Sequence, residues 1–479
     1  MPARTPFSTP GTDRLRLTLR MKATLVVFAA VMFTGGTDLT KVTVGLPRIT
    51  ADLSAGPLQG LWIADVYGLV AGALLLPAAV LADTVGRKRV YLAGLLLAAT
   101  TAAVAATAPS ATVLVLARAV QGASSAMLIA GTVTIIRVTF PGIRLRAVAY
   151  GVWAASFSVG SAFGPLVGGA LVEWGHWRWL FAVNVPVLLL CAVAAAMVLA
   201  ETRNPDPPVF DLPSVLASVS GVALVVAGLK GLAQEEVPVV LSLAGALTGA
   251  LLLVLFVLRQ LRLPRAFLDV RLFRLPSFTA STVVVLIANG AFAGVLFVLT
   301  QRFQEVEGMT AIGAGWALMP LALASALGAV LAPRVQDLLA PERTLMVGVG
   351  AAATGLGMLA LAGPGPGLRV AAMVVLGLGT GVIMTIGANL IMSSAPEDRT
   401  ADAGAIQESA FTIGAGAGIA LLGASSLVLA RVGEGSVDPA AIYGPGADQA
   451  LRVVAAGFAL VSLVAIWLLR RGTHEDPGR

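Results

Sequence analysis

The sequence has few charged residues. Only 12% of its 479 residues are Asp, Glu, Lys or Arg, whereas a soluble domain has about 25%. Such a chain cannot cover a water-facing surface, and its 57% hydrophobic content indicates a membrane protein rather than two or three soluble domains. The apolar runs are continuous and about 20 residues or longer, which favours transmembrane helices over a β-barrel.

Cysteine, histidine and lysine are also scarce. The single cysteine, Cys191, excludes an intrachain disulfide, and one Cys with two His offers no metal-ligand cluster. No Lys is followed by Ser or Thr, so the chain has no Walker A loop for ATP. No nucleophile, base and orienting group occur together. We therefore expect no enzyme activity, cofactor, metal, ATP or nucleic-acid partner.

Fourteen hydrophobic segments are long enough to cross a hydrocarbon core of about 30 Å. The predicted spans are 22–46, 57–82, 90–108, 111–137, 146–173, 178–200, 212–232, 238–259, 278–302, 309–332, 343–363, 368–393, 403–430 and 450–470. Lys and Arg gather in the amino-terminal tail and in the loops on its side. The positive-inside rule therefore predicts a multi-pass protein with both termini in the cytoplasm.

An internal repeat divides these spans into two sets of six. The fifth span matches the thirteenth at an offset of 254 residues, so that Phe157, Gly160 and Gly164 fall on Phe411, Gly414 and Gly418. The seventh and eighth spans are then an insert. The predicted division is a cytoplasmic tail (1–21), a six-helix half (22–200), two inserted helices with a linker (201–274), a second six-helix half (275–470) and a tail (471–479).

The turn after the second span carries a cluster of charges. Gly86 permits a left-handed turn, and Asp83 can cap the next helix or pair with Arg87 or Arg89. With Lys88, these residues either latch one half against the other in one conformation or only set the topology. The run Leu-Ala-Asp-Thr-Val-Gly-Arg-Lys resembles the signature loop of the major facilitator superfamily, although Thr stands where that family has Arg.

The fifth span contains a glycine motif. Gly160, Gly164 and Gly168 are spaced by four, which allows close helix packing, and Pro165 removes a backbone hydrogen bond. With Gly169, the run either forms a hinge or serves ordinary packing. It resembles the antiporter motif of the same superfamily, which is associated with exporters.

Four charged residues are expected to form a network in the first half: Asp38, Lys41, Asp65 and Arg118. Counted at 1.5 Å per residue, Asp38, Asp65 and Arg118 each lie about 10–13 Å below the outer boundary. Asp38 and Lys41 are three residues apart and can pair on one helix face. The run from Asp38 resembles the first-helix signature of the fourteen-helix drug:proton antiporters, and the setting of Arg118 resembles the superfamily's helix-four motif, tied to proton transfer. Asp38 is the first proton candidate, Asp65 the second and Arg118 their modulator.

Other polar residues are weaker candidates for a substrate cavity. Trp62 and Tyr67 flank Asp65 and face either the cavity or the interface belt. Gln121 follows Arg118, and Asn184 lies in a run that resembles a common sequence of the same branch. Glu408 is either a neighbour of a helix cap or an acid at the inner mouth.

These resemblances cover nearly the whole chain and imply an all-α major facilitator fold of fourteen transmembrane helices. They imply a proton-coupled exporter of amphipathic small molecules, with the bilayer, protons and the exported molecule as partners. The acids of the first half favour a cationic substrate. Lys41 leaves two alternatives open, since it either tunes Asp38 or attracts a substrate carboxylate. The alternative functions are a dedicated exporter of one natural-product antibiotic and a substrate sensor that does not transport.

Overall fold

The computed structural model describes residues 18–203, 211–232, 237–263, 268–361, 365–396, 399–434 and 438–474. The first half consists of α1 (Leu19–Asp52), α2 (Pro57–Val85), α3 (Arg87–Ala106), α4 (Ala111–Thr139), α5 (Gly142–Trp174) and α6 (Trp179–Ala182) continued by α7 (Asn184–Val198). The inserted helices are α8 (Leu212–Gly231) and α9 (Val239–Arg262). The second half, after η1 (Val270–Arg274), consists of α10 (Pro276–Gln301) with η2 (Arg302–Val306), α11 (Ala311–Leu338), α12 (Pro341–Leu361), α13 (Pro366–Ser394), α14 (Thr400–Glu434), and α15 (Pro439–Ala441) with η4 (Ile442–Gly446) and α16 (Ala447–His474).

All fourteen predicted spans correspond to helices that are long and apolar enough to cross a membrane. The predicted first span ends too early, because α1 continues through Pro47 to Asp52 instead of ending at residue 46. Proline lacks an N–H, so the carbonyl of Thr43, four residues earlier, loses its helical donor. A membrane helix tolerates this only where a neighbour supplies a donor. Here the Gln301 amide, from the second half, donates to that carbonyl at 2.7 Å.

The two halves repeat one packing pattern, as the internal repeat predicts. In the first half α1 packs on α5, α2 on α4, and α3 on both α4 and α7. In the second half α10 packs on α14, α11 on α13, and α12 on both α13 and α16. The fold therefore consists of two six-helix halves with two inserted helices, as predicted.

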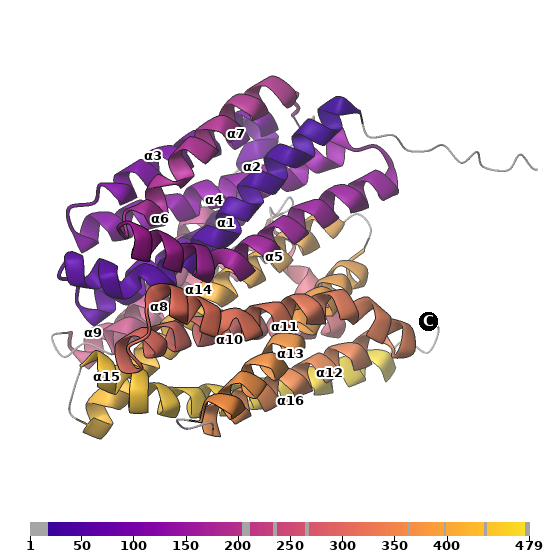
Figure 1. Cartoon of the computed structure of the whole chain (residues 1–479). Helices are drawn as coiled ribbons and strands as arrows, with labels where there is room; N and C mark the ends of the chain where they lie inside the picture. Colours follow the sequence, from indigo (N-terminus) through magenta and orange to yellow (C-terminus); the bar gives the residue numbers. More distant parts are fainter. Residues whose placement is uncertain are drawn as a thin grey trace, which may run out of the picture.

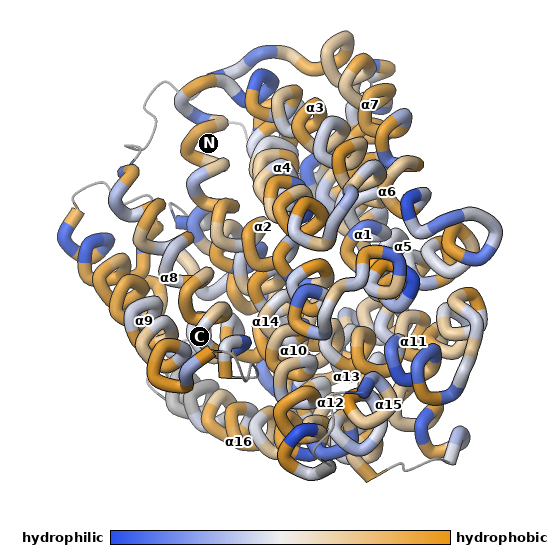
Figure 2. Tube along the Cα trace, turned by 90° about the vertical axis from the view of Figure 1, so that its left-hand side faces the viewer, coloured by the Kyte–Doolittle hydropathy of each residue, from blue (hydrophilic) through white to orange (hydrophobic). Residues whose placement is uncertain are grey.

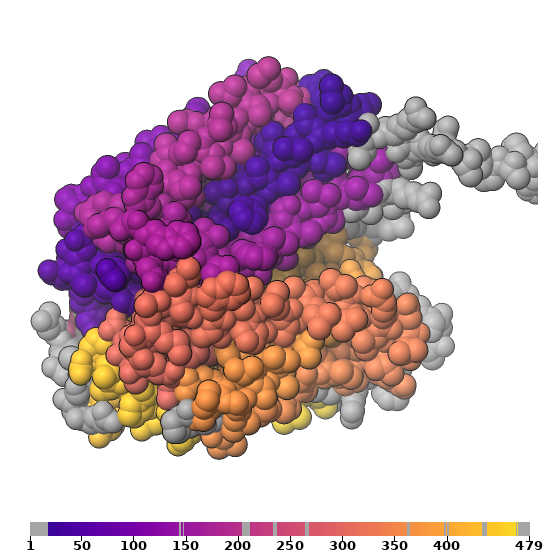
Figure 3. All heavy atoms as spheres, in the orientation of Figure 1, coloured from indigo at the N-terminus to yellow at the C-terminus, as the bar shows by residue number. Residues whose placement is uncertain are grey.

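The two ends of the bundle differ in how the halves meet. We call the end where α1 begins and α16 ends the terminal face, and the opposite end the distal face (Figure 1). The halves join through α2 with α14 and α5 with α11. Figure 3 shows them in contact toward the distal face and separated toward the terminal face. On the distal side Gln304 donates to the Val44 carbonyl at 2.9 Å, and Glu173 accepts from the Ile312 N–H at 3.2 Å.

The inserted helices form a hairpin at one edge of the bundle, beside α2 and α14 (Figure 2). Most of the apolar side chains of α9, among them Val240 and Leu247, are exposed and suit a lipid-facing surface. At the terminal end Arg259 donates two hydrogen bonds of 2.8 and 2.9 Å to Asp211. These bonds hold the pKa of the Asp211 carboxyl below its usual range. The hairpin is therefore fastened at that end by a charged pair.

Candidate functional site

Asp38 lies at the centre of a buried cluster in the first half. Its Oδ1 atom is 3.2 Å from Nζ of Lys41 and accepts a 2.9 Å hydrogen bond from the amide of Asn184. Its Oδ2 atom is 2.8 Å from Nη1 of Arg118. Asp38 is 5% exposed and Arg118 is fully buried. Because an isolated charge is costly within a membrane, these contacts explain how the carboxylate is held there.

Asn184 bridges the two members of the Asp38–Lys41 pair. Its side-chain oxygen accepts a 2.7 Å hydrogen bond from Lys41, while its NH₂ group donates to Asp38. Asn184 begins α7 at a break in the sixth span, after the short helix α6. The turn before α6 is anchored to the end of α1, since Trp177 and Arg178 both donate to Asp52 at 2.9 and 2.8 Å. This partly exposed pair joins the start of the sixth span to the distal end of α1.

Arg118 connects three helices of the first half. Besides Asp38 on α1, it donates to the Ile63 carbonyl on α2 at 3.3 Å and to the Gln121 side chain on α4 at 3.2 Å. Its guanidinium also lies over the Tyr67 ring, 4.6 Å from the ring centroid. A change in the charge of Asp38 would therefore alter, through Arg118, how α1, α2 and α4 pack.

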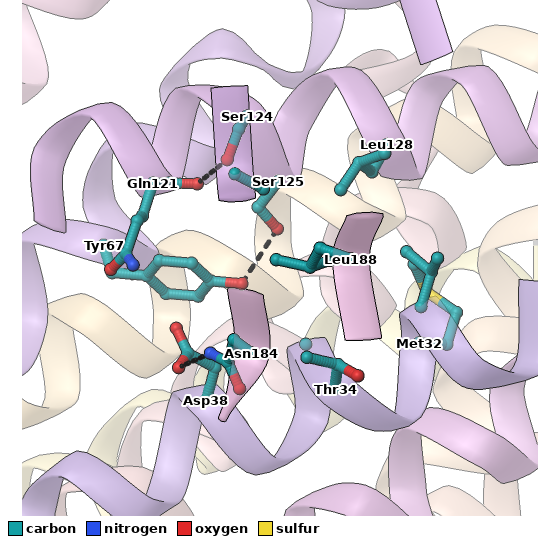
Figure 4. A pocket seen from close by; sticks show the side chains of 13 residues that line it. Met32, Thr34, Asp38, Tyr67, Gln121, Ser124, Ser125, Leu128, Asn184 and Leu188 are labelled. Carbon is teal, nitrogen blue, oxygen red and sulfur yellow. Dashed lines mark hydrogen bonds between the residues drawn. The ribbon is translucent and has the colours of Figure 1, made fainter. Parts of the chain in front are cut away.

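A small cavity of about 50 Å³ opens beside Asp38 (Figure 4). It is lined on its polar sides by Asp38, Tyr67, Gln121, Ser124, Ser125, Thr34 and Asn184. Tyr67 donates a 3.0 Å hydrogen bond to Ser125 across it. The other lining residues of α1 precede Asp38, and those of α4 follow Arg118. Since α1 begins and α4 ends at the terminal face, the cavity extends from the carboxylate in that direction. A polar space of this size holds more than one water molecule, since one needs about 10–15 Å³.

Asp65 has a partner that the sequence interpretation missed. Both of its carboxylate oxygens are within 2.8 Å of Nζ of Lys230, on the inserted helix α8. The Lys230 ammonium lies 3.6 Å from the centroid of the Trp62 ring. Asp65 therefore belongs to a second buried pair, outside the Asp38 cluster. The only signal in the sequence was a lysine near the end of an apolar span.

The glycine motif of α5 forms the contact with α1. A Cβ atom on Gly164 would lie 1.8 Å from Oγ1 of Thr40, and one on Gly168 would lie within 3.0 Å of the Lys41 backbone. Gly160 approaches the Phe33 carbonyl in the same way. Gly169 instead faces α11 of the second half, and Pro165 lies within the continuous helix. The motif thus positions the helix that carries Asp38 and Lys41.

The charged turn between α2 and α3 contacts its own half in this conformation. Asp83 pairs with Arg87 at 2.8 Å, and Lys88 donates to the Ala196 carbonyl at the end of α7. Arg89 is 3.6 Å from Glu201, in the segment that follows α7. These contacts tie the turn to the end of α7.

Replacing Gly86 by alanine is expected to damage this turn. Gly86 has a φ of 130°, and an added Cβ would lie 2.6 Å from the Glu201 carboxylate. Backbone strain of this kind costs about 1–3 kcal/mol. We expect Gly86→Ala to lower the thermal unfolding temperature and the transport rate, whereas Gly350→Ala, at a helical position with open space, should leave both unchanged. Equal behaviour of the two variants would contradict this role of Gly86.

The five weaker candidates are divided by the structure. Tyr67, Gln121 and Asn184 line the cavity beside Asp38. Trp62 packs under Lys230 instead. Glu408 lies in α14, two turns after that helix begins at Thr400, and is partly exposed.

Comparison with known proteins is consistent with this arrangement. The family model described as Major Facilitator Superfamily matches residues 26–419. The multidrug efflux pump LfrA of Mycolicibacterium smegmatis is 35% identical over 88% of this chain and 82% of its own length. The tetracenomycin C resistance and export protein of Streptomyces glaucescens is 31% identical over 86% of this chain and 76% of its own. A solved structure of a bacterial homologue of the human lysosomal transporter Spinster aligns with a TM-score of 0.67 at 16% identity, covering 97% of this chain and 99% of that one.

Proposed function

Because this chain belongs to the major facilitator superfamily and to its drug-efflux branch, we propose that it exports amphipathic organic molecules in exchange for protons. It is a transporter of the multi-pass membrane class and not an enzyme. The observation that carries the proposal is Asp38, a buried carboxylate whose oxygens contact three side chains and which borders a small polar cavity. Such a group can hold a proton, release it, and change the packing around it.

The orientation follows from the charges. With the positive-inside rule placing the terminal face in the cytoplasm, the halves are closed on the outside and separated on the inside. This is the inward-open stage of a cycle in which units 22–200 and 275–470 rock about a central site. The small cavity then leads from Asp38 toward the cytoplasm and serves as the route by which the proton leaves.

The proton step follows from the contacts of Asp38. Ionised Asp38 pairs with Arg118 and Lys41, and so draws α1 toward α4. A proton arriving from outside neutralises the carboxylate and weakens both pairs, because the charge that holds the two cations is removed. Lys41 is 1% exposed and is engaged by Asp38 and Asn184. These contacts favour tuning of Asp38 over binding of a substrate carboxylate.

Glu408 supports a cationic substrate. It lies one helical turn before Thr412 and two before Gly416, and both of these contact Gly68 of α2. Glu408 therefore lies on the α2-facing side of α14, nearer the terminal face than these contacts. No ion pair of its carboxylate occurs among the described residues. A partly exposed acid at this place would attract a lipophilic cation from the cytoplasm.

Neutralising Glu408 should weaken the binding of cations selectively. For Glu408→Gln we expect the KM for ethidium to rise about tenfold, which corresponds to about 1.4 kcal/mol of lost attraction. The maximal rate should change little, because the variant leaves the Asp38 cluster intact. Gln407→Ala is the neighbouring control. An unchanged KM for ethidium in Glu408→Gln would remove Glu408 from the substrate path.

The proposed function is tested with the purified chain in proteoliposomes under an imposed pH gradient. Lipophilic cations such as ethidium and acidic or zwitterionic antibiotics are offered in turn. Gradient-driven accumulation of several cations supports multidrug antiport. Accumulation of a single antibiotic instead supports a dedicated exporter. If the chain transported a compound at a rate that does not depend on the pH gradient, this would contradict proton coupling.

A further inference from the structure

The inserted helix α8 places a charged group deep inside the protein. Lys230 is 1% exposed, and its ammonium lies 2.8 and 2.7 Å from the two carboxylate oxygens of Asp65 on α2. The Trp62 ring covers it at 3.6 Å from the ring centroid, a distance typical of a cation–π contact. Lys230 therefore gains both an ion pair and a ring contact from the same helix, α2.

This pair lies beside a contact between the two halves. α2 meets α14 closely, since Gly72 would bring a Cβ atom to 2.5 Å from the Ile413 side chain. α8 packs against both helices. Leu69 of α2, Val226 of α8 and Ala420 of α14 form a small buried apolar cluster. Val226 is one helical turn before Lys230, so the cluster and the ion pair lie on the same face of α8. The inserted helix thus spans the line along which the halves move against each other.

Apart from Lys230, the described residues of α8 and α9 make no buried ion pair with the first half. α9 has few buried side chains, and its close packing is with α8, where Gly228 and Gly249 allow the backbones to approach. Contacts of apolar side chains with α2 and α14 can slide, because lipid tails are as apolar as the side chains they replace. A buried ion pair cannot slide in the same way, because separation leaves two unpaired charges in a membrane.

We propose that Lys230 is a positioning residue that fixes the inserted helix pair to α2, and that this attachment sets the balance between the inward-open and outward-open arrangements of the α2–α14 contact. The inference rests on the proposed transport function. It gives the inserted helices a part in the conformational cycle. It also gives Asp65 a structural partner, so that Asp38 is the carboxylate left for proton coupling.

The test compares single and double variants in the full-length chain. Lys230→Met and Asp65→Asn each leave one buried charge unpaired, the double variant Asp65→Asn/Lys230→Met removes both, and Lys230→Arg keeps the charge. Arg262→Met removes an exposed cation from α9 and is the control. Ethidium transport is measured in proteoliposomes. Spin labels at Val85 and Leu338, exposed at the terminal ends of α2 and α11, report the separation of the halves. Cys191, the single native cysteine, is replaced by serine in every variant.

We expect Lys230→Met and the double variant both to lower the maximal rate about tenfold and to change the ratio of long to short label distances at least about threefold. Lys230→Arg and Arg262→Met should stay close to the unmodified chain. The double variant matters most, because it carries no unpaired charge and keeps the test valid even where the single variants fold poorly. A double variant with a normal transport rate and normal spin-label distances would overturn the proposal. It would show that the pair only neutralises two buried charges. An unmodified chain without proton-coupled transport would defeat the proposed function, while the distances would still decide the role of Lys230.

Discussion

Replacing Asp38 by asparagine should abolish transport driven by a pH gradient. The variant leaves Arg118 and Lys41 buried without their carboxylate, although both are within 3.2 Å of it in the structure. Removing one partner of a buried pair destabilises the fold by about 3–5 kcal/mol. Asparagine also cannot carry the exchanged proton, so we expect the gradient-driven rate to fall at least about a hundredfold. The measurement is the initial rate of ethidium accumulation in proteoliposomes with an imposed gradient.

Asp52→Asn is the matched control for this variant. Asp52 lies on the same helix, α1, and is also paired with an arginine, Arg178, but at the partly exposed distal end. Exposed ion pairs contribute about 0–1 kcal/mol, so the gradient-driven rate should stay near that of the unmodified chain. Gradient-driven transport that survives in Asp38→Asn, with Asp52→Asn behaving alike, would move the coupling site elsewhere.

The second large effect is expected at Gly164, where alanine should disable transport without any change of charge. Its Cβ would lie 1.8 Å from Oγ1 of Thr40, and the Thr37 carbonyl at 3.1 Å limits the room to move. The packing of α1 on α5 must then open, and overpacking of this kind costs about 1–3 kcal/mol or more. Because α1 carries Asp38 and Lys41, the displacement also misplaces them against Arg118. We expect a fall in transport rate of at least about tenfold.

Gly151→Ala controls for helix composition. Gly151 lies on the same helix, and an added Cβ there meets nothing within 4 Å. Alanine is the better helix former, so Gly151→Ala should transport normally and unfold at the same temperature or slightly higher. A Gly164→Ala variant that transports as fast as Gly151→Ala would show that the close approach of α1 and α5 is not required.

Much of the fold follows from the sequence alone. Fourteen apolar segments predict fourteen helices because the bilayer fixes their length, and the repeat predicts that the two halves share one packing pattern. The need of Arg118 for a buried partner was also predictable, since an arginine in a span is too costly to leave unpaired. Arg118 and Asp38 lie a similar number of residues from the outer ends of their predicted spans, which places the two at the same depth.

The Asp65–Lys230 pair could not be predicted in the same way. The side of the bundle on which an inserted hairpin docks depends on how α8 fits against α2 and α14, and a span with apolar residues all round carries no such information. The sequence interpretation therefore grouped Asp65 with Asp38 by depth alone. In the charged turn, the pair of Asp83 with Arg87 follows from their spacing of four residues. The contacts of Lys88 and Arg89 with the segment at the end of α7 depend on how the turn packs and could not be predicted.

The movement of protons caused by the substrate decides whether Asp38 carries the exchanged proton. Proteoliposomes that contain a pH-sensitive dye receive ethidium from outside, with no gradient imposed. We expect entering ethidium to drive protons out through Asp38, so that the lumen becomes alkaline with the unmodified chain and stays unchanged with Asp38→Asn. Equal alkalinisation by the two proteins would contradict the claim that Asp38 carries the exchanged proton.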